Sequence, residues 1–75
     1  MKELFLPPFG EVVGKFVKLE KEGLTLTFTH EIVVRLSYDQ YKKLAEEVQK
    51  LHIKPGDLIG VLNAGSELKI RRLGR

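Results

Sequence analysis

The sequence predicts a small, mainly β domain of five strands with one α-helix between the third and fourth strands, in the order βββαββ. Three observations support this prediction: almost unbroken apolar-polar alternation over residues 24–37, helical spacing of apolar residues over 38–52, and turn residues between the β-rich segments. With 75 residues, the chain is long enough for one domain. We expect an extended apolar arm over residues 1–11 and a single domain over residues 12–75.

The arm contains the sequence "ELFLPPFG". Its two prolines fix φ and withdraw two backbone donors, which favours an extended segment over a central strand. The apolar side chains of the arm are Leu4, Phe5, Leu6 and Phe9. They require cover, either from the chain's own domain or from another subunit to which the arm docks.

The first strand of the domain is expected over residues 12–20, "VVGKFVKLE". Neither of its alternating rows is cleanly apolar, and a glycine inside a strand often marks a bulge or bend at which the side-chain phase changes. We therefore expect the bend at Gly14. The polar segment Glu20 to Gly23 then supplies the turn into the second strand.

Residues 24–37, "LTLTFTHEIVVRLS", alternate without a glycine, proline, asparagine or aspartate. One strand of this length would be about twice the usual five or six residues, so a turn is expected. A three-residue loop preserves the alternation, and the pattern therefore predicts a loop at Thr29, His30 and Glu31 with Phe28 paired to Ile32. A single bent strand remains the alternative, and it would give a four-stranded sheet with one helix.

The helix is expected over residues 38–52. Ser37 at the N-cap and Gln40 three residues later form a capping box, and Asp39 lies in the first turn, where the helix dipole favours negative charge. Apolar residues recur on one face, and Lys and Glu side chains cover the other. After the turn "KPGD", the segments "LIGVL" and "ELKIRRL" predict a hairpin with Gly65 in the left-handed position of its loop.

This element order, Gly14 in the long first strand and "KPGDLIGV" before the fourth strand together resemble the oligonucleotide/oligosaccharide-binding fold, or OB-fold. The resemblance covers residues 12–73 and implies a partly open, five-stranded Greek-key barrel. It also implies a single-stranded ligand on the outer face of strands one to three. The flanking loops would then be 20–23 and 63–67.

Charge is distributed unevenly along the chain. Residues 1–52 hold eight basic and eight acidic side chains, whereas residues 53–75 hold five basic and two acidic ones, so the net charge of +3 arises at the C-terminal end. This excess either attracts a polyanion or is a solvated basic tail. The absence of cysteine, of a long apolar run and of a signal-peptide pattern favours a cytoplasmic protein. Abundant Lys and Glu favour a thermophilic, archaeal source.

The sequence shows no catalytic or metal-ligand signature. His30 and His52 lie far from each other and from any recognisable ligand spacing, and Ser37 and Ser66 are explained by capping and turn formation. No glycine-rich phosphate-binding motif occurs. We therefore expect neither an enzyme nor a metal or other cofactor.

The first functional hypothesis is weak binding of single-stranded DNA or RNA, and the alternative is a protein-interaction module or small homodimer that uses the arm. For Phe16, core packing and base stacking both remain open, because its position depends on the bend. The expected nucleic-acid-binding residues are Phe16, Lys18, Thr25, Thr27, Val33, Arg35, Lys69, Arg71 and Arg72. The expected partner-docking residues are Leu4, Phe5, Leu6 and Phe9.

Overall fold

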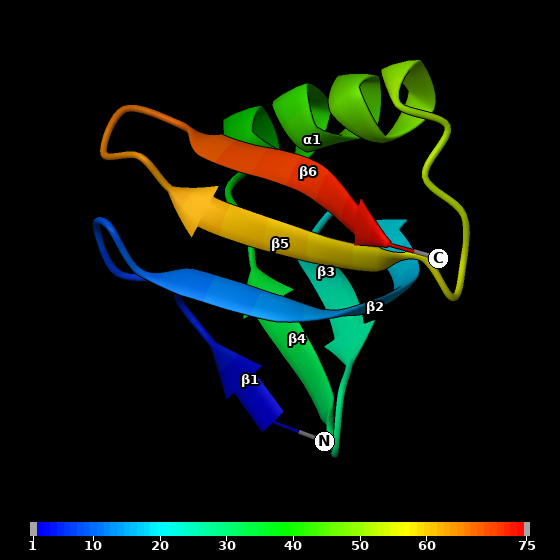
Figure 1. The fold of residues 1–75 in the computed structure, drawn as a ribbon. Coiled ribbons are helices and arrows are strands. Elements are labelled where there is room, and N and C mark those ends of the chain that lie inside the picture. The colour runs from blue at the N-terminus through cyan, green and yellow to red at the C-terminus, as the bar shows by residue number, and fades with distance from the viewer. Residues whose placement is uncertain (1, 75) are drawn as a thin grey trace.

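A computed structural model describes residues 2–74 as one mixed β-sheet with a single helix against it (Figure 1). The sheet has six strands in the order β1-β4-β3-β2-β5-β6. The elements are β1 (Lys2–Leu4), β2 (Glu11–Glu20), β3 (Gly23–Thr27), β4 (Glu31–Arg35), α1 (Tyr38–Lys50), β5 (Leu58–Asn63) and β6 (Leu68–Gly74). The mainly β class and the position of the helix are confirmed.

The expected five-stranded Greek-key barrel is not confirmed, because the strands form one open sheet that contains a sixth strand. The extra strand, β1, comes from the N-terminal arm and pairs in parallel with β4, with Glu3 opposite Val33. Both prolines follow β1 and therefore withdraw no donor from it. Since β1 occupies the second edge of β4, β4 and β6 do not pair, and α1 packs against β6 and β2 on the core side.

The hairpin between β3 and β4 confirms two strands and a three-residue loop, but the predicted loop is one residue too late. Thr27 pairs with Glu31 and Leu26 with Ile32, so the loop consists of Phe28, Thr29 and His30. Alternation restricts the loop to an odd length and leaves its position open. Phe28, which was expected to pair and face the core, is 74% exposed.

Strand β2 changes its side-chain phase at a bulge between Phe16 and Lys18, rather than at Gly14. Gly14 instead permits close packing, since a Cβ there would lie 3.1 Å from the carbonyl oxygen of Thr27. Val17 is the extra residue of the bulge, and it lets Phe16 face the core and Lys18 face outward. The bulge thereby determines which side chains of β2 reach solvent.

Helix α1 begins as expected and ends slightly earlier. The Ser37 hydroxyl accepts the backbone N–H of Gln40, and the Gln40 side chain accepts the backbone N–H of Ser37, which completes the capping box. At the other end, His52 has φ +55°, and the N–H of Ile53 donates to the carbonyl of Val48. This is a Schellman ending in which histidine holds a position that glycine usually holds, at a cost of roughly 1–2 kcal/mol.

The core lies between the curved sheet and α1. Leu44 is the fully buried residue of the helix, and Ile53 seals the core just beyond its end. The buried apolar side chains are Phe16, Leu24, Leu26, Val34, Leu44, Ile53, Ile59, Val61, Leu68 and Ile70. Because these residues come from β2 to β6, α1 and the segment after α1, one core supports both halves of the sheet.

Candidate binding surfaces

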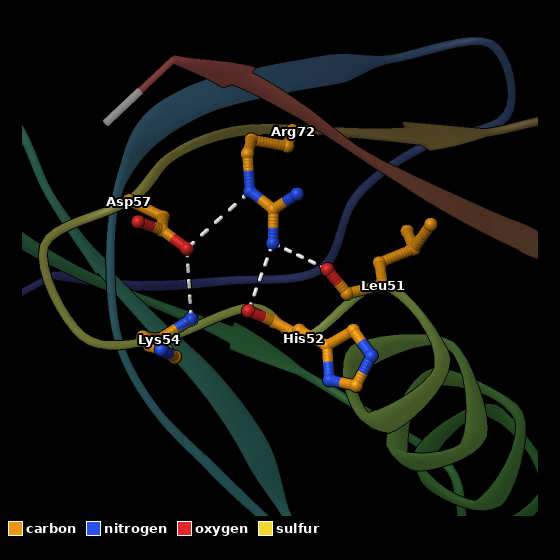
Figure 2. A network of polar contacts seen from close by, with 5 residues as sticks. All are labelled: Leu51, His52, Lys54, Asp57 and Arg72. Atoms are coloured by element: carbon orange, nitrogen blue, oxygen red, sulfur yellow. Dashed lines mark hydrogen bonds and ion pairs between the residues drawn. The ribbon is translucent and has the colours of Figure 1, made fainter.

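Arg72 joins the end of α1 to the turn before β5 (Figure 2). Its Nη2 donates to the carbonyls of Leu51 and, at 2.8 Å, of His52, and its Nε lies 3.4 Å from Oδ2 of Asp57. The same carboxylate oxygen accepts the backbone N–H of Lys54 at 2.9 Å. A guanidinium is well suited to this position, since cations are favourable at a helix C-terminus. Arg72 was expected to bind nucleic acid, and its donors are instead used within the fold.

Phe16 was expected to be a possible stacking platform on the outer face. It is 6% exposed and packs in the core beside Leu26, with which it pairs. Its backbone N–H donates to the carbonyl of Asp57, and its carbonyl accepts the N–H of Gly56. The structure therefore gives the core-packing alternative for Phe16, and its ring is not available to a base.

The outer face over β1, β4, β3 and the end of β2, here called the β3 face, has a hollow of about 300 Å³. Its side chains are Glu3, Lys18, Glu20, Glu22, Thr25, Glu31, Val33 and Arg35, together with Gly23. Two cations against four carboxylates give this face a net charge of −2.

The predicted residues on the β3 face are placed as outer residues, but they form a poor polyanion site. Thr25 is 3% exposed, Thr27 and Val33 are half-buried, and Arg35 donates to Glu3 at 3.0 Å. Lys18 lies 3.4 Å from Glu20. Both cations of this face are thus accompanied by a carboxylate.

The outer face over the first half of β2, β5 and β6, here called the β5 face, has the opposite charge. Strand pairing places its side chains in three rows: Glu11, Leu62 and Lys69; Val13, Gly60 and Arg71; and Lys15 with Leu58. Leu73 lies at the register shift between β5 and β6, and its side chain reaches Gly60. Three cations against one carboxylate give a net charge of +2. Arg71 lies 3.9 Å from Glu11, and both side chains are largely exposed.

A hollow of about 340 Å³ lies on the β5 face between its first two rows, lined in part by Glu11, Leu62, Lys69 and Arg71. Gly60 forms part of its floor, and a Cβ at that position would lie 3.3 Å from Cδ1 of Leu73. Val13 and Leu73 are exposed beside it. The β5 face therefore combines exposed apolar side chains with an excess of cations.

Sequence reasoning missed Lys15, Val13, Leu62 and Leu73 as members of a common surface. Alternation groups Leu58, Gly60 and Leu62 correctly, but the expected three-residue loop over residues 63–65 put Leu68 and Ile70 on their side, which is wrong. Leu62 pairs with Lys69 and Gly60 with Arg71, whereas Leu68 and Ile70 lie in the core. The missing information was the pairing of β2 with β5, which joins residues about 50 positions apart along the chain.

The arm places its apolar residues in two environments. Leu4 and Leu6 pack against the core, whereas Phe5 is 79% and Phe9 is 77% exposed. The N–H of Phe9 donates to the carbonyl of Asn63 at 2.6 Å, and its ring lies beside Gly65 in the loop between β5 and β6. Phe9 is therefore at the end of the β5 face that carries Lys69.

Residues 2–74 contain no cluster of three or more His, Cys, Asp or Glu side chains that could hold a metal ion. Within the same residues, no helix has the length and apolarity needed to cross a membrane. Comparisons with protein-family models, curated proteins and solved structures find no match for this chain.

Proposed function

We propose that the protein is a non-enzymatic binding module that binds single-stranded nucleic acid weakly through the β5 face. The observation that carries this proposal is the charge of that face, where Lys69 and Arg71 line a mainly apolar hollow, Lys15 lies further along β2 on the same face, and Glu11 is the accompanying carboxylate. A phosphate backbone gains most of its affinity from such cations. The site is thus displaced from the β3 face toward the basic C-terminal strand.

The arrangement of strands supports an OB-like relationship. The central strand β2 pairs with β3 and with β5, and the chain order from β2 to β6 is three strands, a helix and two strands. In the OB-fold, a single strand lies on the second and third strands, which correspond here to β3 and β4, so the β5 face is the neighbouring part of the same outer surface. Closure between β4 and β6 is replaced here by β1 and α1.

The expected affinity is low. Phe9 is the exposed aromatic side chain beside this face, and each stacked base contributes only roughly 1–3 kcal/mol. The remaining affinity would come from phosphate contacts, which weaken as salt rises. Binding should therefore be clear at low ionic strength and nearly lost at physiological ionic strength.

Fluorescence anisotropy with labelled oligothymidine and oligouridine tests this proposal at low and physiological salt. Lys69→Glu with Arg71→Glu should reduce affinity at least about 30-fold, because four units of charge change on the binding face. The matched pair Lys18→Glu with Arg35→Glu, on the β3 face, should change it less than about threefold. Equal losses in both pairs, or no binding by the wild type at low salt, would reject the β5 face as the site.

A second candidate function is association with a protein partner through the arm, and the exposure of Phe5 and Phe9 favours it. Deleting the arm would be a poor test, because deletion removes β1 and the core contacts of Leu4 and Leu6. The double variant Phe5→Ser with Phe9→Ser is a better test, because it changes only exposed side chains and leaves β1 in the sheet.

In sedimentation velocity, the full wild-type chain should self-associate and the double variant should be monomeric. Phe28→Ser changes another exposed phenylalanine and should still self-associate. A wild-type monomer at high concentration would contradict a homodimer.

A further inference from the structure

A groove of about 630 Å³ lies on the helix side of the sheet, away from the β5 face. One wall is the end of β2 from Phe16 to Leu19, and the other is formed by α1 and the segment that follows it. The walls are mainly apolar, with Tyr41, Ala45, Val48, Ile53 and Pro55 facing β2 residues. The groove is widely open to solvent, which suits an extended segment lying along it better than an enclosed small molecule.

The edge of β2 along this groove is open. β5 pairs with β2 only over Glu11 to Lys15, and the turn at Gly56 and Asp57 completes the pairing at Phe16. Beyond Phe16, the strand pairs with β3 on its other side, and among residues 2–74 no backbone group pairs with the edge that faces the groove. An open strand edge beside an apolar groove is the arrangement that accepts an added strand.

The charges around the groove indicate which charge the added strand should carry. Its charged or titratable nitrogen-bearing side chains are Lys18, His52 and Lys54, and none of its lining residues carries a carboxylate. Lys18 also lies 3.4 Å from Glu20, and both of these side chains are largely exposed. The excess of positive charge is complementary to an acidic segment.

His52 contributes a side chain to the groove from the ending of α1. It adopts φ +55° in the ending of α1, where glycine would avoid the steric cost, and its side chain lines the groove. The histidine therefore supplies the groove with a nitrogen-bearing side chain that a glycine at this position would lack.

We infer that this groove binds an extended peptide segment of a partner protein, in which acidic and apolar residues alternate, by strand addition to the end of β2. Apolar side chains of the segment pack between Val17 and Val48, and its carboxylates face Lys18 and Lys54. Nucleic acid fits the groove less well, since the walls are mostly aliphatic and Phe16 is buried. This inference concerns a surface separate from that of the proposed function.

Selection of random peptides displayed on phage against the full chain tests the inference, followed by anisotropy with the enriched peptide. We expect enrichment of alternating acidic and apolar residues. Lys54→Glu and, separately, Ala45→Glu should each weaken the selected peptide at least about tenfold, because both put a carboxylate into the groove. Lys21→Glu, the same charge change in the turn between β2 and β3, should alter affinity less than about twofold.

Amide chemical shifts locate the peptide independently of substitutions. Perturbation at Val17 to Leu19 and at His52 to Lys54, with slowed hydrogen exchange along the β2 edge, is the expected result. Enrichment of basic or uncharged peptides, perturbation confined to the β5 face, or displacement of the peptide by oligothymidine would overturn the inference. Circular dichroism of each variant establishes that it is folded before affinities are compared.

Discussion

The β5 face and the β3 face lie on the same outer side of one sheet and share β2, yet their net charges are +2 and −2. The bulge at Val17 makes this possible, because it lets Lys15 in one half and Lys18 in the other both face outward. Lys18 lies beside Glu20, whereas Lys15 borders Leu58 and Val13. The charge around an outward-facing side chain of β2 therefore depends on the half of the sheet in which it lies.

The largest expected effect is a difference in stability between variants of the two adjacent arginines of β6. Only Arg71 belongs to the β5 face. Arg72→Ala should lower the free energy of unfolding by about 2–3 kcal/mol, because it removes a half-buried cation from two carbonyls and a carboxylate. Arg71→Ala should lower it by less than about 0.5 kcal/mol. Urea unfolding monitored by circular dichroism measures both, and similar losses would contradict the structural role of Arg72.

The second prediction removes the difference in net charge between the two faces. Glu20→Lys with Glu31→Lys changes the β3 face from −2 to +2, and we expect oligothymidine to bind about tenfold more tightly through a second basic face. The control pair Glu46→Lys with Glu47→Lys makes the same change of total charge on α1. If the control gains as much affinity, net charge rather than the local face governs binding in the anisotropy assay.

The third prediction concerns the salt dependence of binding, which measures how many cations of the β5 face contact the nucleic acid. With three cations in contact, the slope of log affinity against log salt should be about −2, since single strands release about 0.7 counterion per contact. Arg71→Ala should make this slope shallower by about 0.7. A slope unchanged by Arg71→Ala would place the phosphates elsewhere.

The smallest effect concerns the exposed ion pair of the β3 face. Glu3→Gln removes the partner of Arg35, which lies 3.0 Å away, and should change the free energy of unfolding by less than about 1 kcal/mol because both side chains are well solvated. Urea unfolding in low and high salt measures it. A loss of several kcal/mol would show that the link between β1 and β4 depends on this pair rather than on backbone pairing.

Sequence reasoning located the elements better than the surfaces. It found the helix with its capping box, the hairpin with an odd-length loop and the hairpin around Gly65, because each depends on residues close together in the chain. It missed β1, since the two prolines after Leu4 suggested an arm, and it placed the phase change of β2 at Gly14. Phe16 and Arg72 appeared as candidate ligand contacts because burial and long-range hydrogen bonds are not visible in a local pattern.

The sequence by itself determined that β3 and β4 form strands and where α1 begins, because periodicity and capping act within a few residues. It also determined that the last strand is basic. Only the tertiary structure decided that β1 occupies the edge of β4 and that β2 joins β3 to β5. It also decided that Arg72 turns toward the helix while Arg71 stays on the β5 face. These outcomes depend on backbone and carbonyl groups that come together only when segments far apart in the chain pair in one sheet.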